Sequence, residues 1–373
     1  HRAIMNRTVR NEAPAAALTP NREDEGRDGI VGMIRAGIVG LGRMGFTHCA
    51  TMNSLPGVEV VAVCEQSALV RGAIERYTSF RFYTNLASML DSEELDCLVV
   101  TTPTKLHLPM VQSAINAGLH VFVEKPLCLS SDDAAFLRQA ATEARLVNQV
   151  GYHNRFVGTF REARRLLSLS AIGPICHVSG ESSGPVVTGE RKATWRARAS
   201  EGGGCLYDYA SHTMNLLQYV VDEPFVVTDA VMTSMYSREV DDAVFAVMHF
   251  ENGATGHLSA NWSDRSYRKM STQITATGLK GRLTVDVQEL RVYLAEPIDG
   301  YHIGWNQRFI TDLVAPISFY LRGEEYAEQV EYFVERIRRG DRENINSFET
   351  AGMTDAAIDE IKACAGRVRL NRG

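Results

Sequence analysis

The amino-acid sequence predicts an α/β protein of two parts, in which a parallel sheet covered by helices precedes an α+β region with a large, mostly antiparallel open sheet. Three observations support this. The chain has 373 residues, more than one average domain. Continuous β-branched runs alternate with helix-like segments from Ile34 to about residue 155, as in sheets that are buried on both faces. Beyond residue 156 the strands lengthen and are joined by hairpin turns such as Asn252-Gly253.

Five buried strands are expected in the first region. They begin at or near Ile38, Val58, Leu95, His120 and Val147. The intervening residues 109–118 and 131–144 have the pattern of helices. Ser131, followed by two acidic residues, is the expected N-cap of the second helix.

Hairpin strands dominate the second region. We expect residues 241–250 and 254–263 to form one hairpin, and residues 270–277 and 282–294 to form another. Two helices, residues 324–339 and 347–365, end this region, and Asn346 and Glu349 have capping-box spacing at the start of the second. We therefore expect a disordered leader over residues 1–33, a first domain over 34–155 and a second over 156–373, with the C-terminal helix able to pack back on the first domain.

Composition excludes several classes of protein. A net charge of −6 disfavours a nucleic-acid-binding surface, and no apolar run reaches the roughly 20 residues that a membrane span needs. Seven scattered cysteines without C-x-x-C spacing indicate reduced thiols and a cytoplasmic protein. The histidines lack the spacing of metal ligands, so no metal is expected.

A glycine-rich motif follows the first strand. Gly40, Gly42 and Gly45 form the pattern G-x-G-x-x-G between an apolar strand and a helix-compatible segment. Such glycines allow a tight turn, close approach of a pyrophosphate and packing of the helix on the strand. Glu65 ends the second strand 20 residues later, where a carboxylate binds ribose hydroxyls and repels a 2′-phosphate. The motif predicts a Rossmann-type site that prefers NAD to NADP.

Further polar residues end the next strands. Thr101, Thr102 and Pro103 lead to His107, and Glu124 and Lys125 end the following strand. Ligands of open α/β sheets bind at this carboxyl edge. In EGGGCLYDYASH, Asp208 and His212 are one helical turn apart and should share a face. Alone, such a pair is more often a structural hydrogen bond. Cys205 lies between the glycines and Asp208, and we expect it to be a small buried side chain that fills space in the core.

The segments GLGRMG, TTPTKLH, EKP, GYHNRF and GGGCLYDYASH resemble, in order and spacing, those of the Gfo/Idh/MocA family, the glucose–fructose oxidoreductase and inositol dehydrogenase superfamily. The resemblance covers Ile34 to about Ala365. It implies a Rossmann NAD-binding domain over residues 34–155, a substrate-binding and oligomerisation domain over 156–373, and a homodimer or homotetramer. It also implies that Lys125, Asp208 and His212 form the catalytic group.

The residues support this chemistry independently. A histidine suits general acid–base work near neutral pH, a lysine can stabilise a developing alkoxide, and Asp208 could bind a substrate hydroxyl, orient the imidazole, or do both. The predicted cofactor-binding residues are Gly40, Gly42, Arg43, Met44, Gly45, Glu65, Thr101, Thr102, Pro103, His107, Glu124 and Lys125. The predicted substrate-binding residues are His153, Asn154, Arg155, Trp195, Arg196, Asp208 and His212.

The predicted function is an NAD(H)-dependent dehydrogenase that acts on a secondary hydroxyl or ketone of a sugar, cyclitol or sugar derivative. An anionic substrate such as a nucleotide-sugar stays open, since four cations surround Trp195, although a solvated loop would have the same composition; they are Arg191, Lys192, Arg196 and Arg198. Two alternatives remain: an NAD-dependent glycoside-cleaving enzyme that oxidises its substrate transiently, and a non-catalytic NAD-binding regulator.

Overall fold

The first sheet is parallel and has six strands in the order β3-β2-β1-β4-β5-β6. The computed structural model describes residues 32–189, 194–314, 317 and 319–370. The strands are β1 (Ile34–Val39), β2 (Val58–Cys64), β3 (Arg81–Tyr83), β4 (Cys97–Val100), β5 (His120–Val123) and β6 (Asn148–Val150). The helices between them are α1 (Arg43–Ser54), α2 (Ala68–Ile74), α3 (Leu86–Ser92), α4 (His107–Asn116) and α5 (Ser131–Glu143). The predicted parallel sheet is confirmed.

Strand order explains where a ligand would bind in this half. β1 is central and pairs with β2 on one side and β4 on the other, so the chain direction across the sheet reverses there. Open α/β sheets bind ligands outside the carboxyl ends of the strands at this switch point. The turn Gly40–Gly42 after β1 and Thr101 after β4 therefore face a common crevice.

The second sheet has nine strands in the order β14-β13-β12-β11-β7-β10-β9-β8-β15 and is mostly antiparallel. Its strands are β7 (Ile175–Ser183), β8 (Phe225–Ser234), β9 (Ala243–Phe250), β10 (Thr255–Asn261), β11 (Ser271–Gly278), β12 (Gly281–Asp286), β13 (Glu289–Leu294), β14 (Gly304–Phe309) and β15 (Gly366–Arg369). Residues 282–294 form two strands and not one, because the Asp286 carboxylate accepts hydrogen bonds from the amides of Gln288 and Glu289 and closes a turn.

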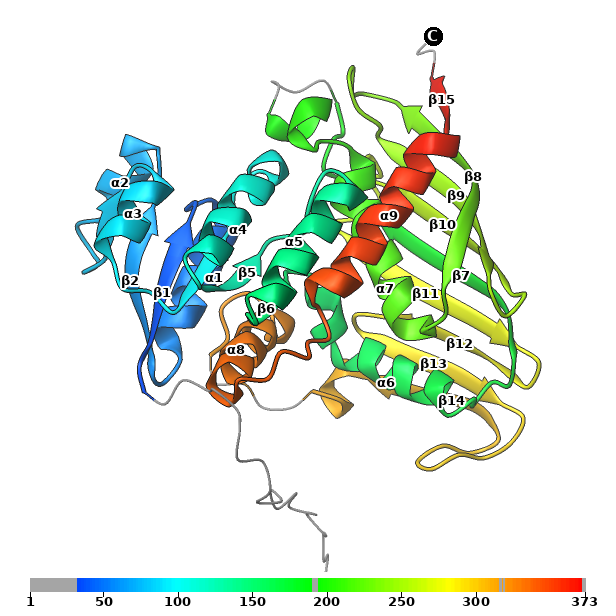
Figure 1. Cartoon of the computed structure of the whole chain (residues 1–373). Coiled ribbons are helices and arrows are strands. Elements are labelled where there is room, and N and C mark those ends of the chain that lie inside the picture. The colour runs from blue at the N-terminus through cyan, green and yellow to red at the C-terminus, as the bar shows by residue number, and fades with distance from the viewer. Residues whose placement is uncertain (1–31, 190–193, 315–316, 318, 371–373) are drawn as a thin grey trace, which may run out of the picture.

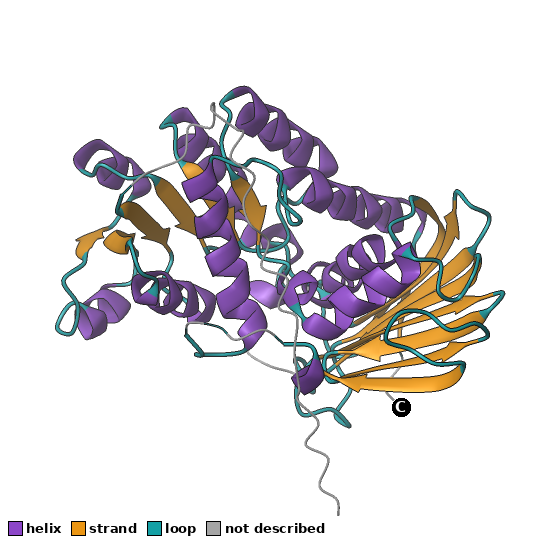
Figure 2. Ribbon diagram, turned by 90° about the horizontal axis from the view of Figure 1, so that it is seen from below, coloured by secondary structure: helices purple, strands orange, loops and turns teal. Residues whose placement is uncertain are grey.

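Helices cover one face of this second sheet (Figures 1 and 2). They are α6 (Gly158–Ser168), α7 (Ser211–Val221) and α9 (Phe348–Cys364). β9 shows why they pack there: Val244, Ala246 and Met248 point into the core, while Phe245 and Val247 alternate with them on the outer face.

The two C-terminal helices also complete the first sheet. Phe333 and Ile337 of α8 (Glu324–Arg339) share a core with Ile34 and Ile38 of β1, and Phe348 of α9 joins the core on the other side of that sheet. Both C-terminal helices therefore pack against the first sheet. The division of the chain near residue 155 stays a prediction, and the predicted leader lies almost wholly outside the described residues.

Two predicted caps are displaced by one residue. The Ser130 hydroxyl, and not Ser131, accepts the hydrogen bond from the Asp133 amide at the start of α5. At the start of α9 the cap is Ser347, whereas Asn346 donates its side-chain amide to the Tyr152 carbonyl.

All seven cysteines are free. Within the described residues, no helix has both the length and the apolar content needed to cross a membrane.

Asp242, at the start of β9, organises the loop beside the cleft. Its carboxylate is fully buried and accepts hydrogen bonds from the backbone amides of Met235, Tyr236 and Ser237 and from the indole of Trp262 at 2.7 Å. A buried donor that loses its acceptor costs its full desolvation energy.

We expect Asp242→Ala to lower the free energy of unfolding by about 2–4 kcal/mol, because it leaves five donors without this acceptor: the three backbone amides, the Trp262 indole and the Ser237 hydroxyl. Thermal and urea denaturation measure the change. Glu251→Ala, at an exposed turn between β9 and β10, is the matched control and should shift stability by less than about 0.5 kcal/mol. Equal stability of the two variants would contradict this role of Asp242.

Candidate functional site

A cleft of about 1860 Å³ lies between the two sheets and gathers most of the predicted site residues. Those that line it are Gly40, Gly42, Arg43, Met44, Glu65, Thr101, Thr102, Pro103, Glu124, Lys125, His153, Asn154, Trp195, Arg196, Asp208 and His212. The first ten follow β1, β2, β4 and β5 of the first sheet, and the others come from later parts of the chain. Residues from both regions therefore share one cavity.

The glycine turn has the shape that a dinucleotide requires. A Cβ atom at Gly45 would lie 1.9 Å from the Gly40 carbonyl oxygen, so this position packs against the turn itself. A Cβ atom at Gly42 would have no described atom within 4 Å. Gly42 also precedes α1 without offering a side-chain cap to its first amides. Open space beside uncapped helix amides fits a pyrophosphate.

Glu65 and Thr101 hold this turn in place. One Glu65 carboxylate oxygen accepts the Leu41 amide at 2.7 Å, and the other accepts the Ser67 amide at 2.8 Å. The Thr101 hydroxyl contacts the carbonyls of Val39 and Gly40 at 2.9 and 2.7 Å. Glu65 lies at the rim where the predicted ribose contact would form, and each oxygen keeps a second lone pair for it.

Lys125 and Asp208 connect the two regions at the centre of the cleft. Lys125 Nζ donates to Asp208 Oδ1 at 2.7 Å and to the Asp208 carbonyl at 3.0 Å. Arg196 Nε donates to the other carboxylate oxygen at 3.1 Å. Burial opposes ionisation of Asp208, but the charges and hydrogen bonds of Lys125 and Arg196 outweigh it and lower its pKa to about 2. The carboxylate is thus ionised and doubly paired.

Asp208 and His212 both line the cleft, but they make no hydrogen bond to each other within the described structure. Asp208 belongs to a π-helical turn, Leu206–Ala210, that leads into α7, where His212 follows. π-Turns are frequent at functional sites. The Asp208 carboxylate is directed to Lys125 and Arg196, so the hypothesis that it orients the imidazole is not supported by these contacts.

His212 is a neutral imidazole in a ring cluster. Burial, and then the charges of Lys125 and His153, lower its pKa well below the usual value. Its Nδ1 is buried without a hydrogen-bond partner among the described residues, and the residue lines the cleft. The ring of Tyr152 stands edge-on at 5.9 Å and that of His153 at 5.0 Å between centroids. Such an imidazole can accept a proton at neutral pH.

Tyr326 completes this cluster and was missed by the sequence analysis. Its ring stacks on His153 with centroids 4.5 Å apart, and its hydroxyl lies 3.4 Å from His153 Nε2. Burial lowers the pKa of His153 to about 4. Tyr326 lies in α8, 173 residues after His153. The helix was predicted, but its amphipathic pattern carried no signal that one tyrosine enters the cleft.

Glu124 lines the cleft beside Lys125 and is held by His48. His48 Nε2 lies 2.7 Å from Glu124 Oε1. Burial would raise the pKa of Glu124, but the hydrogen bond from His48 and nearby positive charges outweigh it and keep the pKa below its usual value. The sequence carried no signal that His48 would contact Glu124, which lies 76 residues later. Nowhere in the described chain do three His, Cys, Asp or Glu side chains come together as a metal ion would require.

Two predicted site residues lie elsewhere. His107 is buried, and its ring nitrogens contact the carbonyls of Thr102 and Pro126 at 3.0 and 2.9 Å, so it joins the two cleft loops and does not line the cavity. Arg155 is 4% exposed and donates to the side chain and backbone of Asn215 and to the Ile345 carbonyl. Both side chains bond to carbonyl groups away from the cavity, and neither lines the cleft.

Among the described residues, the cations near Trp195 supply less free positive charge to the cleft than the sequence suggests. The Arg196 guanidinium lies 4.5 Å from the Trp195 ring centroid and is paired with Asp208. Arg198 is exposed outside the cleft, and Arg191 and Lys192 lie outside the described residues. Cys205 is fully buried, as expected, and burial raises its pKa well above the usual value.

The last helix fixes the loop that follows Lys125. Asp355 and Asp359, one turn apart on α9, accept hydrogen bonds from the amides of Cys128 at 3.0 Å and Ser131 at 2.8 Å. These contacts join residues 227 and 228 positions apart in the chain. The loop that bears Lys125 is therefore anchored to α9 as well as to β5.

Known proteins are similar to this chain in sequence and in fold. The chain is 27% identical over 69% of its length to 2,7-anhydro-N-acetylneuraminate hydratase of Escherichia coli, covering 68% of that protein. It is 25% identical over 61% of its length to scyllo-inositol 2-dehydrogenase (NAD(+)) of Bacillus subtilis, covering 67% of it. A levoglucosan dehydrogenase structure in complex with NADH and levoglucosan superposes with a TM-score of 0.78 at 22% identity, over 89% of this chain and 96% of that one.

Two family models match consecutive parts of the chain. Residues 34–152 match the oxidoreductase family with an NAD-binding Rossmann fold, and residues 160–284 match the GFO/IDH/MocA C-terminal domain. The open glycine turn, Glu65 and the cleft fit the dinucleotide that this family binds. The chain therefore belongs to the Gfo/Idh/MocA family of NAD-binding oxidoreductases.

Proposed function

We propose that the protein is an NAD(H)-dependent dehydrogenase that acts on a secondary hydroxyl or ketone of a sugar, cyclitol or sugar derivative. One observation carries the proposal. Lys125, which is paired with Asp208, and the neutral imidazole of His212 line the same cleft as the open glycine turn at Gly42. NAD, when bound, supplies the hydride acceptor. Its proposed holders are the glycine turn, Glu65 and the residues that follow β4 and β5.

The side chains divide the proton chemistry between them. His212 accepts the hydroxyl proton, because its imidazole is neutral and lines the cleft. Lys125 donates a hydrogen bond to the same oxygen and stabilises its developing negative charge. Asp208 fixes the ammonium by two contacts and carries the proposed substrate contact. Tyr326 and His153 shield the imidazole from water.

Names of relatives support a polyol or sugar as substrate. The similar proteins include a scyllo-inositol dehydrogenase and a levoglucosan dehydrogenase, both of which act on secondary hydroxyls of ring compounds by name. An anionic substrate such as a nucleotide-sugar is less favoured, because Arg196 already forms an ion pair with Asp208. A nucleotide-sugar is still included among the substrates to be tested.

Transient oxidation is a second candidate. One relative at 27% identity is named a hydratase of an anhydro sugar, and its name describes no net redox change. The same proton donors and acceptors would serve such a reaction, with the hydride returned at the end of each turnover. Product formation without net NADH would favour this candidate, and stoichiometric NADH would exclude it.

We also propose that the outer face of the second sheet pairs with another copy of the chain, giving a homodimer or homotetramer. This face exposes large apolar side chains towards both ends of the sheet, with Phe245 49% and Val247 44% exposed on β9 and Trp305 61% exposed on β14. Exposed apolar patches often mark protein–protein interfaces.

Phe245→Asp should dissociate the assembly, because a carboxylate on this face would be desolvated in the interface. Light scattering after size-exclusion chromatography measures the mass of each form. Leu69→Asp, at an exposed position of α2, is the control and should leave the mass unchanged. A monomeric wild-type protein, or an unaltered oligomer with Asp at 245, would contradict the proposal.

NADH absorbance with a panel of inositols, aldoses, anhydro sugars and nucleotide-sugars tests the dehydrogenase. We expect net NADH with at least one neutral polyol or sugar, and a loss of about a hundredfold or more in kcat/KM for Lys125→Ala. Arg138→Ala, on the exposed face of α5, is the control. Activity of Lys125→Ala within about threefold of wild type would rule out the mechanism and favour the regulator.

The acid limb of the oxidation profile should lie below pH 6.5. Oxidation requires unprotonated His212, and its lowered pKa keeps it unprotonated as the pH falls through the usual histidine value of 6.5. We expect kcat/KM at saturating NAD to stay level down to that pH and to decline only below it. An acid limb centred at or above pH 6.5 would show that His212 is not the base.

A further inference from the structure

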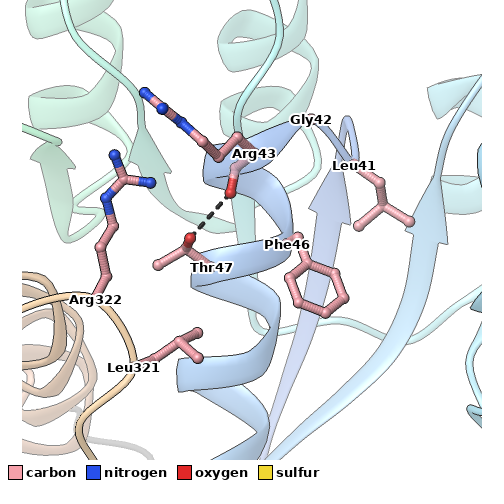
Figure 3. Close-up of a pocket in the computed structure, with 7 residues that line it drawn as sticks. All are labelled: Leu41, Gly42, Arg43, Phe46, Thr47, Leu321 and Arg322. Atoms are coloured by element: carbon pink, nitrogen blue, oxygen red, sulfur yellow. Dashed lines mark hydrogen bonds between the residues drawn. The ribbon is translucent and has the colours of Figure 1, made fainter.

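A second, smaller pocket opens beside the glycine turn. It has a volume of about 440 Å³ and is lined by residues from the start of α1 and from the segment that precedes α8. These are Leu41, Gly42, Arg43, Phe46, Thr47, Leu321 and Arg322. Figure 3 shows both arginine side chains on the same side of the first turn of α1, with the apolar residues on the opposite side and below. Gly42, Arg43 and Arg322 also line the large cleft, so the two cavities share a wall.

Neither arginine forms an ion pair with a described acidic side chain. Arg322 contacts the Tyr326 ring, whose centroid lies 5.0 Å from its guanidinium carbon. Glu325 lines the cleft near enough to interact electrostatically with Arg322, but its carboxylate lies close to Gly323 and forms no ion pair with the guanidinium. Two unpaired guanidinium groups beside the uncapped start of a helix form a strongly electropositive place.

The position of this place indicates its ligand. The amides at the start of α1 and the open space over Gly42 are where a dinucleotide of this family sets its diphosphate. Guanidinium groups bind phosphate oxygens with paired N–H donors. We propose that Arg322, together with Arg43, binds the diphosphate of the cofactor. The inference rests on the NAD-binding part of the proposed function and deepens it by adding a residue from the far end of the chain.

Arg322 also connects the diphosphate to the acid–base cluster. It lies over Tyr326, which stacks on His153, which in turn stands edge-on to His212. The charge of Arg322 contributes to the lowered pKa of His153. An anion bound to Arg322 would weaken the effect of the Arg322 charge on the pKa of His153. It would also fix the position of the guanidinium, which contacts the Tyr326 ring through a cation–π interaction. Arg322 is thus a cofactor-binding residue that also positions the aromatic wall of the cleft.

Direct binding of NADH and of ADP-ribose, which has the diphosphate but no nicotinamide, tests the proposal by calorimetry without any substrate. We expect Arg322→Gln to raise both dissociation constants by roughly tenfold or more at low salt, with the difference shrinking at high salt, because the lost interaction is between charges. Arg322→Lys should recover part of the affinity, since it restores the charge without the paired donors. Arg138→Ala is the matched control for loss of an exposed arginine and should bind like wild type.

Gly42→Ala provides the reference for a blocked diphosphate position. Its Cβ enters space free of described atoms, so the fold should persist while ADP-ribose binding is lost. Unchanged ADP-ribose affinity in Arg322→Gln would overturn the proposal. A loss that is the same at low and high salt would overturn it too, since that result means lost packing on Tyr326. These outcomes are independent of whether a dehydrogenase substrate is found; wild-type protein that binds neither ligand would refute the NAD-binding function itself.

Discussion

The ion pair between Lys125 and Asp208 is the contact on which the arrangement of the site depends. Taking an ammonium group out of water is costly unless a partner replaces the lost hydration. Here the partner comes from the other half of the molecule and offers both a carboxylate and a carbonyl oxygen. Arg196 occupies the second carboxylate oxygen, so Asp208 cannot leave Lys125 for a different partner without exposing a charge. The loop after β5 and the π-turn before α7 are thereby held at a fixed separation, and His212 follows one turn later.

Burial has opposite effects on the two kinds of group in this cleft, and the difference makes the chemistry possible. The carboxylates of Glu124 and Asp208 stay ionised because each has a nitrogen donor at 2.7 Å. The imidazoles of His153 and His212 have no acid at hydrogen-bonding distance within the described chain, so desolvation keeps them neutral. A base and a charged hydrogen-bond donor can therefore stand side by side at neutral pH. Tyr152 and His153, which follow β6, flank the imidazole of His212, and Tyr326 of α8 stacks on His153. The aromatic wall beside the base therefore depends on α8 reaching the first sheet.

Local sequence signals predicted the parts of the site that depend on local structure. The glycine motif, Lys125 at a strand end and Asp208 before His212 could be recognised because strand order brings carboxyl ends together. The contacts of Tyr326, Arg322, His48 and Asp355 could not, since each joins segments that the sequence does not place relative to one another. His107 and Arg155 show the converse error: position beside a motif does not reveal which way a side chain points, and both turn to buried carbonyls. Adjacent capping residues, such as Ser130 and Ser131, are chemically alike, so composition could not choose between them.

The packing of α8 and α9 on the first sheet has a consequence for biosynthesis. Phe333 lies 5.8 Å from Phe122 between ring centroids, and Phe348 packs on the opposite side of the sheet. Both layers of the nucleotide-binding half are therefore completed by helices that follow most of the second sheet in the chain. Domains usually fold in the order in which they are translated. In this chain the N-terminal half must wait, with part of its apolar surface uncovered, until α8 and α9 have been translated. Products truncated before α8 would consequently lack a finished nucleotide pocket, so the capacity to hold a dinucleotide reports that both helices are present.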